Sequence, residues 1–162
     1  MSNTSNTQDY AIVVHGGAGS PHDHDDGCRH AARRAVEELG ISADALEAAI
    51  AAVVAMEDDG RFNAGSGAVL CLDGATVEMD AAIMDTRGRL GAVACVQGVK
   101  NPVLLARTVY GWIDDGMPLA QALERGVDLF DARVPVGLIA VSRTDAHAHS
   151  NQDMPNARIV AS

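Results

Sequence analysis

The stretch RFNAGSGAVL, residues 61–70, places Arg61, Phe62 and Asn63 beside a turn of small residues, Ala64-Gly65-Ser66-Gly67. An apolar run follows the turn. Glycine permits backbone conformations that other residues disfavour, so such a turn can coil tightly. The stretch predicts either a plain connection between a helix and a strand or a loop built to hold a ligand.

A second stretch, GSPHDHDDGCRH, gathers possible ligands of a transition metal. Imidazole and thiolate groups suit zinc and related metals. The spacing matches no closed zinc site, and a solvated, acidic helix start explains the same residues. Metal binding here is one open interpretation, and its ligands would come from His22, Asp23, His24, Asp25, Asp26, Cys28 and His30.

Three other motifs favour plainer explanations. In VVHGGAGSPH, His22 stands where a dinucleotide-binding loop needs its third glycine, and no acidic residue closes a second strand about 20 residues later. Ser66 is flanked directly by glycines, whereas a nucleophile elbow has the spacing G-x-S-x-G. His147 and His149 alternate, which places both on one face of a surface strand.

Composition restricts the class of protein. The 162 residues are 48% hydrophobic, which is enough for one domain with a core. The formal net charge of −10 disfavours binding to nucleic acid and to anionic membranes. No apolar stretch reaches the roughly 18 residues of a membrane helix. Cys28, Cys71 and Cys95 form no Cys-x-x-Cys pair and are expected to be reduced core residues of a cytoplasmic protein.

The elements expected to position these residues give an α+β pattern. After a disordered tail over residues 1–9, an apolar run rich in β-branched residues predicts a buried strand over 10–15. Helical spacing predicts helices over 28–39 and 42–59, the second with Ser42 as its N-cap. From Val69 to Gly98 the pattern predicts a meander of three strands, with turns at Asp73-Gly74 and Arg87-Gly88.

The remaining residues predict two helices and a hairpin. Asn101 is a plausible N-cap before Pro102, and Pro118 begins a similar arrangement. A hairpin over 135–151 turns at Arg143 to Asp145. This order of strands and helices implies an α+β domain over 10–162.

Four blocks, taken in chain order, resemble the isoaspartyl peptidase/L-asparaginase family, also called plant-type asparaginases, of N-terminal-nucleophile hydrolases. The blocks are AIVVHGGAGS, RFNAGSGAVLCLDGATVEMDAAIMD, GAVACVQGVKNPVLLAR and GLIAVSRTDAHAHSNQDMPNA. The resemblance covers most of residues 10–158. It implies a remnant of the four-layer αββα sandwich of these hydrolases.

The resemblance also implies a role for the loop at residues 61–70. In the family this loop coils around a structural sodium ion held by backbone carbonyls, and a hard cation prefers such oxygen ligands. Asn63 matches the asparagine whose amide serves the oxyanion hole. The matching carbonyls belong to Met56, Glu57, Asp59, Phe62, Ala64 and Ser66.

The family's nucleophile has no counterpart in this chain. Family precursors cut themselves before a threonine in a Gly-Thr-Val-Gly context, and the freed amino group then serves as general base for that threonine's hydroxyl. The hydroxyl attacks L-asparagine or a β-aspartyl dipeptide. This sequence contains no Gly-Thr dipeptide. The resemblance therefore implies an internally shortened member, α-subunit-like over 10–109 and late β-subunit-like over 110–158.

Two functions remain open at this stage. The first is a member of this asparaginase family whose inherited substrates are L-asparagine and β-aspartyl dipeptides and which is inactive alone. The second is a non-catalytic partner or regulatory subunit of a full-length relative. Removing central strands leaves sheet edges unpaired, so a homodimer or pairing with such a relative is expected.

Overall fold

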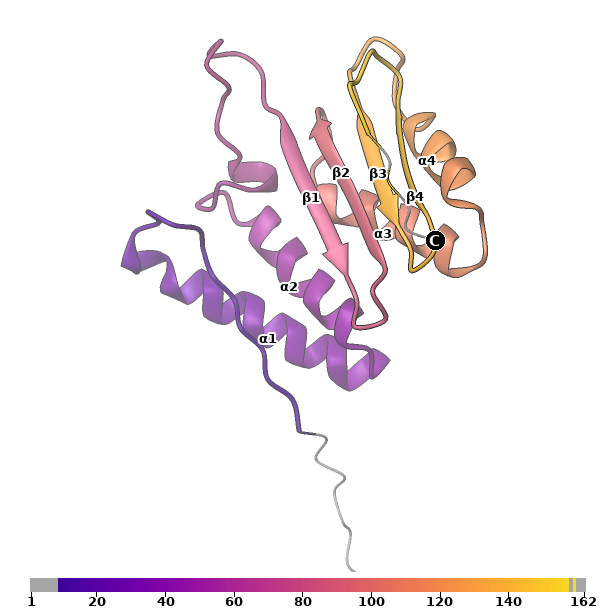
Figure 1. Ribbon diagram of the computed structural model, residues 1–162. Helices are drawn as coiled ribbons and strands as arrows, with labels where there is room; N and C mark the ends of the chain where they lie inside the picture. Colours follow the sequence, from indigo (N-terminus) through magenta and orange to yellow (C-terminus); the bar gives the residue numbers. More distant parts are fainter. Residues whose placement is uncertain (1–8, 158, 160–162) are drawn as a thin grey trace, which may run out of the picture.

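The computed structural model describes residues 9–157 and 159, so residues 1–8 of the expected tail lie outside it. Its fold is α+β, as the sequence predicts (Figure 1). Short 3₁₀ turns lie at His22–His24 and Gly65–Gly67. The helices and strands are α1 (Asp25–Ser42), α2 (Ala45–Asp58), β1 (Met79–Met84), β2 (Leu90–Val96), α3 (Pro102–Asp114), α4 (Leu119–Val127), β3 (Gly137–Val141) and β4 (Ala146–Ser150).

The four strands form one antiparallel sheet in the order β1-β2-β3-β4. Strand β2 pairs with β3 in a register that places Leu90 opposite Val141, so segments about fifty residues apart lie side by side. The predicted hairpin over 135–151 is confirmed as β3 and β4. Helices α3 and α4 pack against one face of this sheet.

The larger core lies between that sheet face and helices α3 and α4. Val93, Leu123 and Leu138 are almost fully buried there. Helix α3 passes residue 110 without a break, and Val109 and Tyr110 are both buried in the same core. The segments before and after residue 110 therefore share one packed interior.

A smaller cluster lies between α1 and α2. It consists of alanines on facing turns, Ala31, Ala35, Ala48 and Ala52, whose small side chains let the two helices lie close together. Ile12 and Val14 pack against the same cluster from an extended segment that crosses α1 (Figure 1).

The predicted strand over residues 10–15 is wrong. The segment is extended, but no backbone hydrogen bond joins it to another strand among the described residues. Val13 is 93% exposed while Ile12 and Val14 are half-buried, so side chains still alternate. An apolar β-branched run becomes a strand only where a neighbouring strand supplies hydrogen-bond partners.

The predicted three-stranded meander is also wrong in its first third. Residues 69–78 form a loop, and only β1 and β2 follow it. Asp73 stabilises the turn because its Oδ1 accepts hydrogen bonds from the backbone of Ala75 and Thr76, at 3.0 and 2.9 Å. Gly74 has a φ of +70°, so the Asp73-Gly74 turn is confirmed although no strand precedes it.

The N-cap of α2 differs from the residue that the sequence predicts. Asp44, and not Ser42, caps α2 by accepting hydrogen bonds from Leu46 and Glu47. Ser42 is the last residue of α1 instead. Pro102 is confirmed at the start of α3, whereas α4 begins one residue after Pro118.

The cysteines are unpaired but are not core residues. Cys28 and Cys71 are half-buried and Cys95 is exposed. Cys95 lies beside an irregularity in the β1–β2 pairing, which turns its side chain away from the helices. Within the described residues, every helix is too short or too polar to span a bilayer.

Candidate functional site

The loop that follows α2 coils back on itself through two glycines. Gly65 has a φ of +53° and lies directly against the backbone of Glu57, whose Cβ is 2.6 Å from where a Cβ on Gly65 would stand. A Cβ on Gly67 would meet the carbonyl oxygens of Phe62 and Gly60. Only glycine fits at either position, so this sequence builds a crowded turn lined by carbonyl groups.

Four carbonyls of the expected sodium set are already partly engaged. Those of Met56 and Asp59 each accept a backbone hydrogen bond at 3.2 Å, and those of Phe62 and Ala64 accept one at 2.8 and 3.1 Å. A carbonyl oxygen has two lone pairs, so each keeps an acceptor site. The donors are all oxygens on an irregular backbone, and this chemistry fits a hard cation.

Phe62 anchors this loop to the first glycine motif. Its side chain is 2% exposed and lies between two glycines. An added Cβ would lie 2.7 Å from its ring at Gly16 and 2.8 Å at Gly27. His24 contacts the same ring edge-on, with centroids 5.9 Å apart. The glycines at 16 and 27 therefore make room for Phe62.

Arg61 ties the loop to the first turn of α1. Its guanidinium forms ion pairs with Asp26 at 2.8 Å and with Asp59 at 2.7 Å. The hydrogen bond from Arg61 lowers the pKa of Asp59 to about 2, so Asp59 stays ionised at any ordinary pH.

Asn63 is held by its amide oxygen. Its Oδ1 accepts a hydrogen bond from the backbone N–H of Val69 at 2.9 Å. Among the described residues no acceptor pairs with its Nδ2. The amide nitrogen is a hydrogen-bond donor, and the bond to Val69 fixes the orientation of the amide.

Glu57 is the one charged side chain in the buried set of the described residues, with 2% exposed. Its Oε1 accepts a hydrogen bond from the N–H of Val103 at 3.1 Å, at the start of α3, while its Oε2 has no partner among the described residues. Burial raises the pKa of Glu57. The Asn101 side chain donates to Asp58 instead of capping α3, so Glu57 takes over that function.

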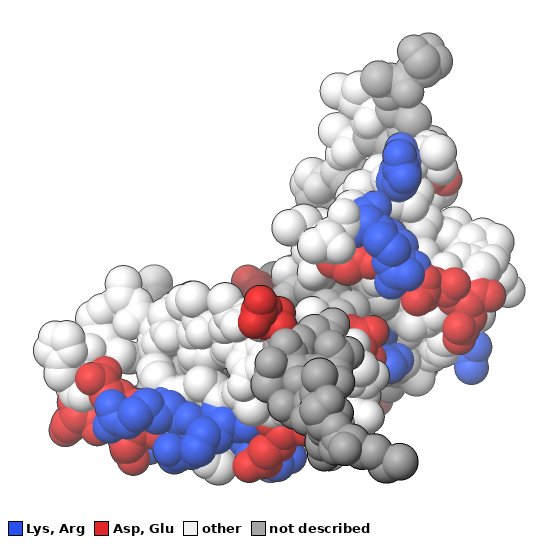
Figure 2. All heavy atoms as spheres, turned by 90° about the horizontal axis from the view of Figure 1, so that it is seen from below, with Lys and Arg blue, Asp and Glu red and all other residues white. Residues whose placement is uncertain are grey.

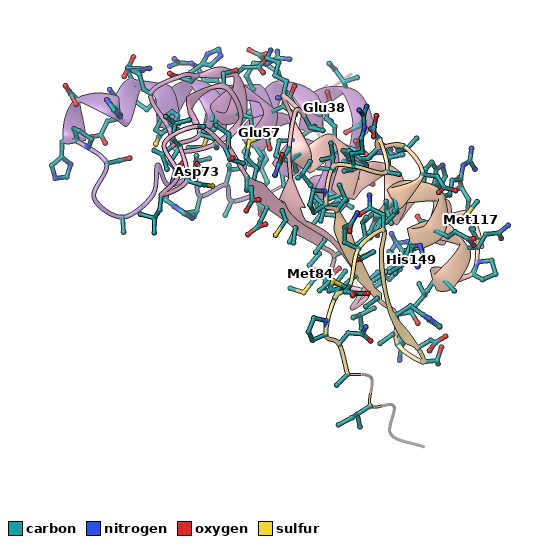
Figure 3. All side chains as sticks on the ribbon, turned by 90° about the horizontal axis from the view of Figure 1, so that it is seen from above. Glu38, Glu57, Asp73, Met84, Met117 and His149 are labelled. Atoms are coloured by element: carbon teal, nitrogen blue, oxygen red, sulfur yellow. The ribbon has the colours of Figure 1, made fainter. Side chains whose placement is uncertain are left out.

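Glu57 and Asn63 share a hollow of about 190 Å³ between the loop and the start of β1. In Figure 3, Glu57 and Asp73 lie at the α1–α2 end of the molecule, away from Met84 and His149. Among the residues that the structure describes, no lysine, arginine or histidine lines the hollow, whereas three carboxylic acids do. The lining residues are Glu57, Asn63, Ala64, Gly65, Ala68, Glu78, Met79, Asp80 and Pro102.

The transition-metal interpretation of residues 22–30 is wrong. In the part of the chain that the structure describes, no three histidine, cysteine or acidic side chains are placed to hold a metal ion. Helix α1 begins at Asp25 and carries His30 along the helix, away from His22 and His24. His24 packs against Phe62 instead.

His147 and His149 do lie on one face of β4, as predicted. They stand opposite Ala140 and Leu138 in the register with β3, which is the face that the helices cover. His147 pairs with Asp145, at 3.2 Å, so neither histidine is part of the loop site.

The Glu57 side chain is the site feature that the sequence argument missed, since only its carbonyl was expected to matter. A helical signal was present: Glu57 stands three and seven residues after Val54 and Ile50, on the apolar face of α2. A carboxylate at such a position predicts a buried group with a specific partner.

The fold and the loop define an α+β protein with a glycine-coiled loop after its second helix. A model of the asparaginase family matches residues 8–122, which is more than half of the chain. The chain therefore belongs to the asparaginase family, and the resemblance drawn from its motifs is confirmed.

Curated relatives agree with this assignment. The chain is 49% identical over 106 residues to a plant-type L-asparaginase of Pyrobaculum calidifontis, covering 60% of this chain and 35% of the relative. It is 49% identical over 110 residues to one of Thermococcus kodakarensis, covering 61% and 34%. It is 45% identical over 105 residues to the isoaspartyl peptidase/L-asparaginase of Homo sapiens, covering 60% and 34%. The chain spans about a third of the length of these relatives.

Proposed function

We propose that this chain is an internally shortened asparaginase, with L-asparagine and β-aspartyl dipeptides as its inherited substrates, and that it is inactive alone. The observation that carries the proposal is the absence of any Gly-Thr dipeptide from the sequence. The threonines after residue 9 follow Ala75, Asp85, Arg107 and Arg143. A nucleophile exposed by self-cleavage has no place to form, so the covalent route is lost.

The charges around Asn63 support the same proposal. An oxyanion hole stabilises developing negative charge with preorganised donors. Here the Asn63 amide would act alone, in a hollow that also contains Glu78 and Asp80. Carboxylates raise the energy of a nearby anion, and no basic residue of the described chain lines the hollow to offset them.

The loop is proposed to keep a structural sodium ion. The carbonyls of Met56, Glu57, Asp59, Phe62, Ala64 and Ser66 would hold it, and the ion would fix the loop shape that orients Asn63. The glycine packing of the loop supports this role because it brings backbone carbonyl groups close together: a Cβ on Gly67 would meet the carbonyl oxygens of Phe62 and Gly60.

A turnover assay tests the proposed inactivity. The purified chain is incubated with L-asparagine and with a β-aspartyl dipeptide while ammonia and free aspartate are measured. We expect no release above a protein-free blank, while a full-length plant-type L-asparaginase in parallel releases both products. Sustained release by the chain would overturn the proposal.

A melting experiment tests the sodium proposal. The chain is expected to melt at a higher temperature in sodium chloride than in choline chloride at equal ionic strength, because an ion that binds the folded state stabilises it. Gly67→Ala, which places a methyl group against the Phe62 carbonyl, should abolish the difference. Equal melting temperatures in both salts for the unaltered chain would refute a bound sodium ion.

A second candidate function is a non-catalytic, cytoplasmic partner of a full-length relative. The favouring observation is that, within the described part of the chain, β1 pairs with β2 only, and no strand pairs with its other edge. Such edges add strands from other chains. Co-expression with a full-length relative and purification through a tag on that relative tests it: retention of this chain supports the partner role, and its loss in the flow-through opposes it.

A further inference from the structure

The sequence contains four Asp-Gly dipeptides, at residues 26–27, 59–60, 73–74 and 115–116. An aspartate before glycine is prone to form a succinimide ring, because glycine has no side chain to block the approach of its backbone nitrogen to the aspartate. The nitrogen loses its proton and bonds to the carboxyl carbon Cγ, and one carboxyl oxygen leaves as water. Water then opens the ring at either carbonyl, which restores aspartate or leaves isoaspartate, whose main chain runs through the former side chain.

Hydrogen bonds hold three of the four aspartates in the folded chain. The guanidinium of Arg61 donates to the carboxylates of Asp26 and Asp59, at 2.8 and 2.7 Å. Asp73 accepts hydrogen bonds from the backbone N–H and from the hydroxyl of Thr76. Each of these side chains must break its bonds before its Cγ can reach the next nitrogen, so folding slows the reaction at all three positions.

The same hydrogen bonds keep these three carboxyl groups ionised. The bond from Arg61 lowers the pKa of Asp26, and it lowers the pKa of Asp59 to about 2. The bond from the Thr76 hydroxyl lowers the pKa of Asp73 to about 2. Ring closure expels water from a protonated carboxyl group more readily than from a carboxylate. Ionisation therefore opposes the reaction at these positions in addition to the restraint.

Asp115 is held by no such bond. Its side chain is exposed, and among the described residues none donates a hydrogen bond to it or pairs with it. Its neighbour Asp114 forms the ion pair with Arg89 instead. Acidic side chains elsewhere lie beside basic ones, as Figure 2 shows along the α1 side of the molecule. The carboxyl group of Asp115 is therefore free to rotate toward the nitrogen of Gly116.

Gly116 is also exposed and forms the turn that ends α3. Its φ is +95°, and its N–H donates to the carbonyl of Ile113 at 3.1 Å, while the N–H of Met117 donates to that of Trp112 at 2.9 Å. In Figure 3, Met117 marks this turn at the outer end of the molecule. A helix end in solvent opens at little cost in free energy, and opening releases the Gly116 nitrogen. Gly27, by contrast, is buried within α1.

We propose that Asp115 is the residue at which the folded chain forms isoaspartate. Isomerisation adds one methylene group to the main chain between Asp115 and Gly116, and the longer chain breaks the pair of hydrogen bonds that ends α3. Trp112, on the last turn of α3, stacks against Arg125 of α4, with the guanidinium carbon 4.4 Å from the ring centroid. The modification therefore loosens the contact between α3 and α4 and does not touch the loop at residues 61–70.

Peptide mapping of the aged chain tests the proposal. The purified chain is stored in warm neutral buffer and digested, and mass spectrometry with electron-transfer fragmentation distinguishes isoaspartate from aspartate in the four Asp-Gly peptides. Position 115 should contain at least about tenfold more isoaspartate than positions 26, 59 and 73, because the other three aspartates must first break hydrogen bonds. In urea, where nothing holds the side chains, the four positions should react at similar rates. Equal amounts at the four positions of the folded chain, a larger amount at another position, or none at 115 when the unfolded chain forms it there, would overturn the proposal.

A pair of variants tests whether hydrogen bonds protect the other positions. Arg61→Gln removes the guanidinium bonds of Asp26 and Asp59 and should raise isoaspartate at both by at least about tenfold. The matched control Arg133→Gln removes an arginine that pairs with Asp131, which no glycine follows, and should change none of the four positions. Circular dichroism checks that both variants fold. Unchanged isoaspartate at positions 26 and 59 in the folded Arg61→Gln variant contradicts protection by these bonds.

A fluorescence measurement checks the structural consequence. Trp112 is the single tryptophan of the chain, so its emission reports on the contact between α3 and α4. The emission should change as isoaspartate accumulates. Asp115→Glu has one more methylene group and cannot close the five-membered ring, so its emission should stay constant on ageing. Constant emission from an unaltered chain that is isomerised at position 115 contradicts the loosened contact. This inference does not depend on whether the chain hydrolyses asparagine.

Discussion

The helix-covered sheet and the α1–α2 layer differ in how completely their cores are built. The sheet with α3 and α4 has a core of branched and aromatic side chains such as Val93, Leu123 and Tyr110. The α1–α2 layer has a core of four alanines, and the extended segment packed against it pairs with no strand of the described residues. The comparison teaches that an apolar run with alternating side chains becomes a paired, buried strand only where the chain also supplies a neighbouring strand and a covering helix.

The largest effect is expected from a matched pair of alanine substitutions, one in each region. Leu138→Ala removes a fully buried side chain in the larger core and should lower the free energy of unfolding by about 3 kcal/mol. Val13→Ala, in the uncovered segment, should change it by less than about 0.5 kcal/mol because that side chain is 93% exposed. Urea unfolding followed by circular dichroism measures both. Similar losses would mean that the segment at 10–15 is covered in solution.

A substitution at Gly16 tests how tightly the loop after α2 packs against the N-terminal segment. Gly16→Ala places a Cβ 2.7 Å from the Phe62 ring and should cost about 1–3 kcal/mol through overpacking. Gly40→Ala, in the open near the end of α1, should be neutral or stabilise by up to about 1 kcal/mol. The same unfolding experiment compares the two. An unchanged free energy of unfolding for Gly16→Ala would show that the Phe62 ring does not pack tightly against residue 16.

The smallest expected effect concerns Glu57, which joins α2 to α3. Because burial raises its folded-state pKa, the protonated form is favoured, and the contribution to stability is present below about pH 4.5 and is lost as pH rises through the folded-state value. Glu57→Gln should match the unaltered chain in acid and exceed its stability by about 1 kcal/mol at neutral pH. Melting curves from pH 4 to 8 measure this, with exposed Glu124→Gln as control. Parallel curves would contradict a buried, ionising Glu57.

Much of the fold was predictable from local signals. Proline and glycine marked the starts of helices and the turns at Gly74 and Gly88, and helical spacing located all four helices. The strand at 10–15 and the first strand of the meander were not, because a strand needs a partner and a pattern does not report one. The helix cap at Asp44 was missed since Ser42 offers an equally good local signal.

The candidate site was predictable to a smaller degree. Asn63 and the glycine loop were identified by resemblance, and their assigned roles stay predictions. The Phe62 ring packs against Gly27 and Gly16, which lie some 35 and 46 positions before it in the sequence. No local sequence pattern connects residues so far apart. The apparent ligand cluster at residues 22–30 failed for the converse reason: neighbours in sequence were separated by the start of α1.

The central claim is that a member of the asparaginase family with no site for self-cleavage performs no hydrolysis alone. Ammonia release from L-asparagine by the purified 162-residue chain, with the mass of the intact protein checked in the same sample, tests it most directly. The expected result is an unbroken chain of 16.8 kDa and no ammonia above the blank. Steady ammonia release together with two fragments split before a threonine would contradict it.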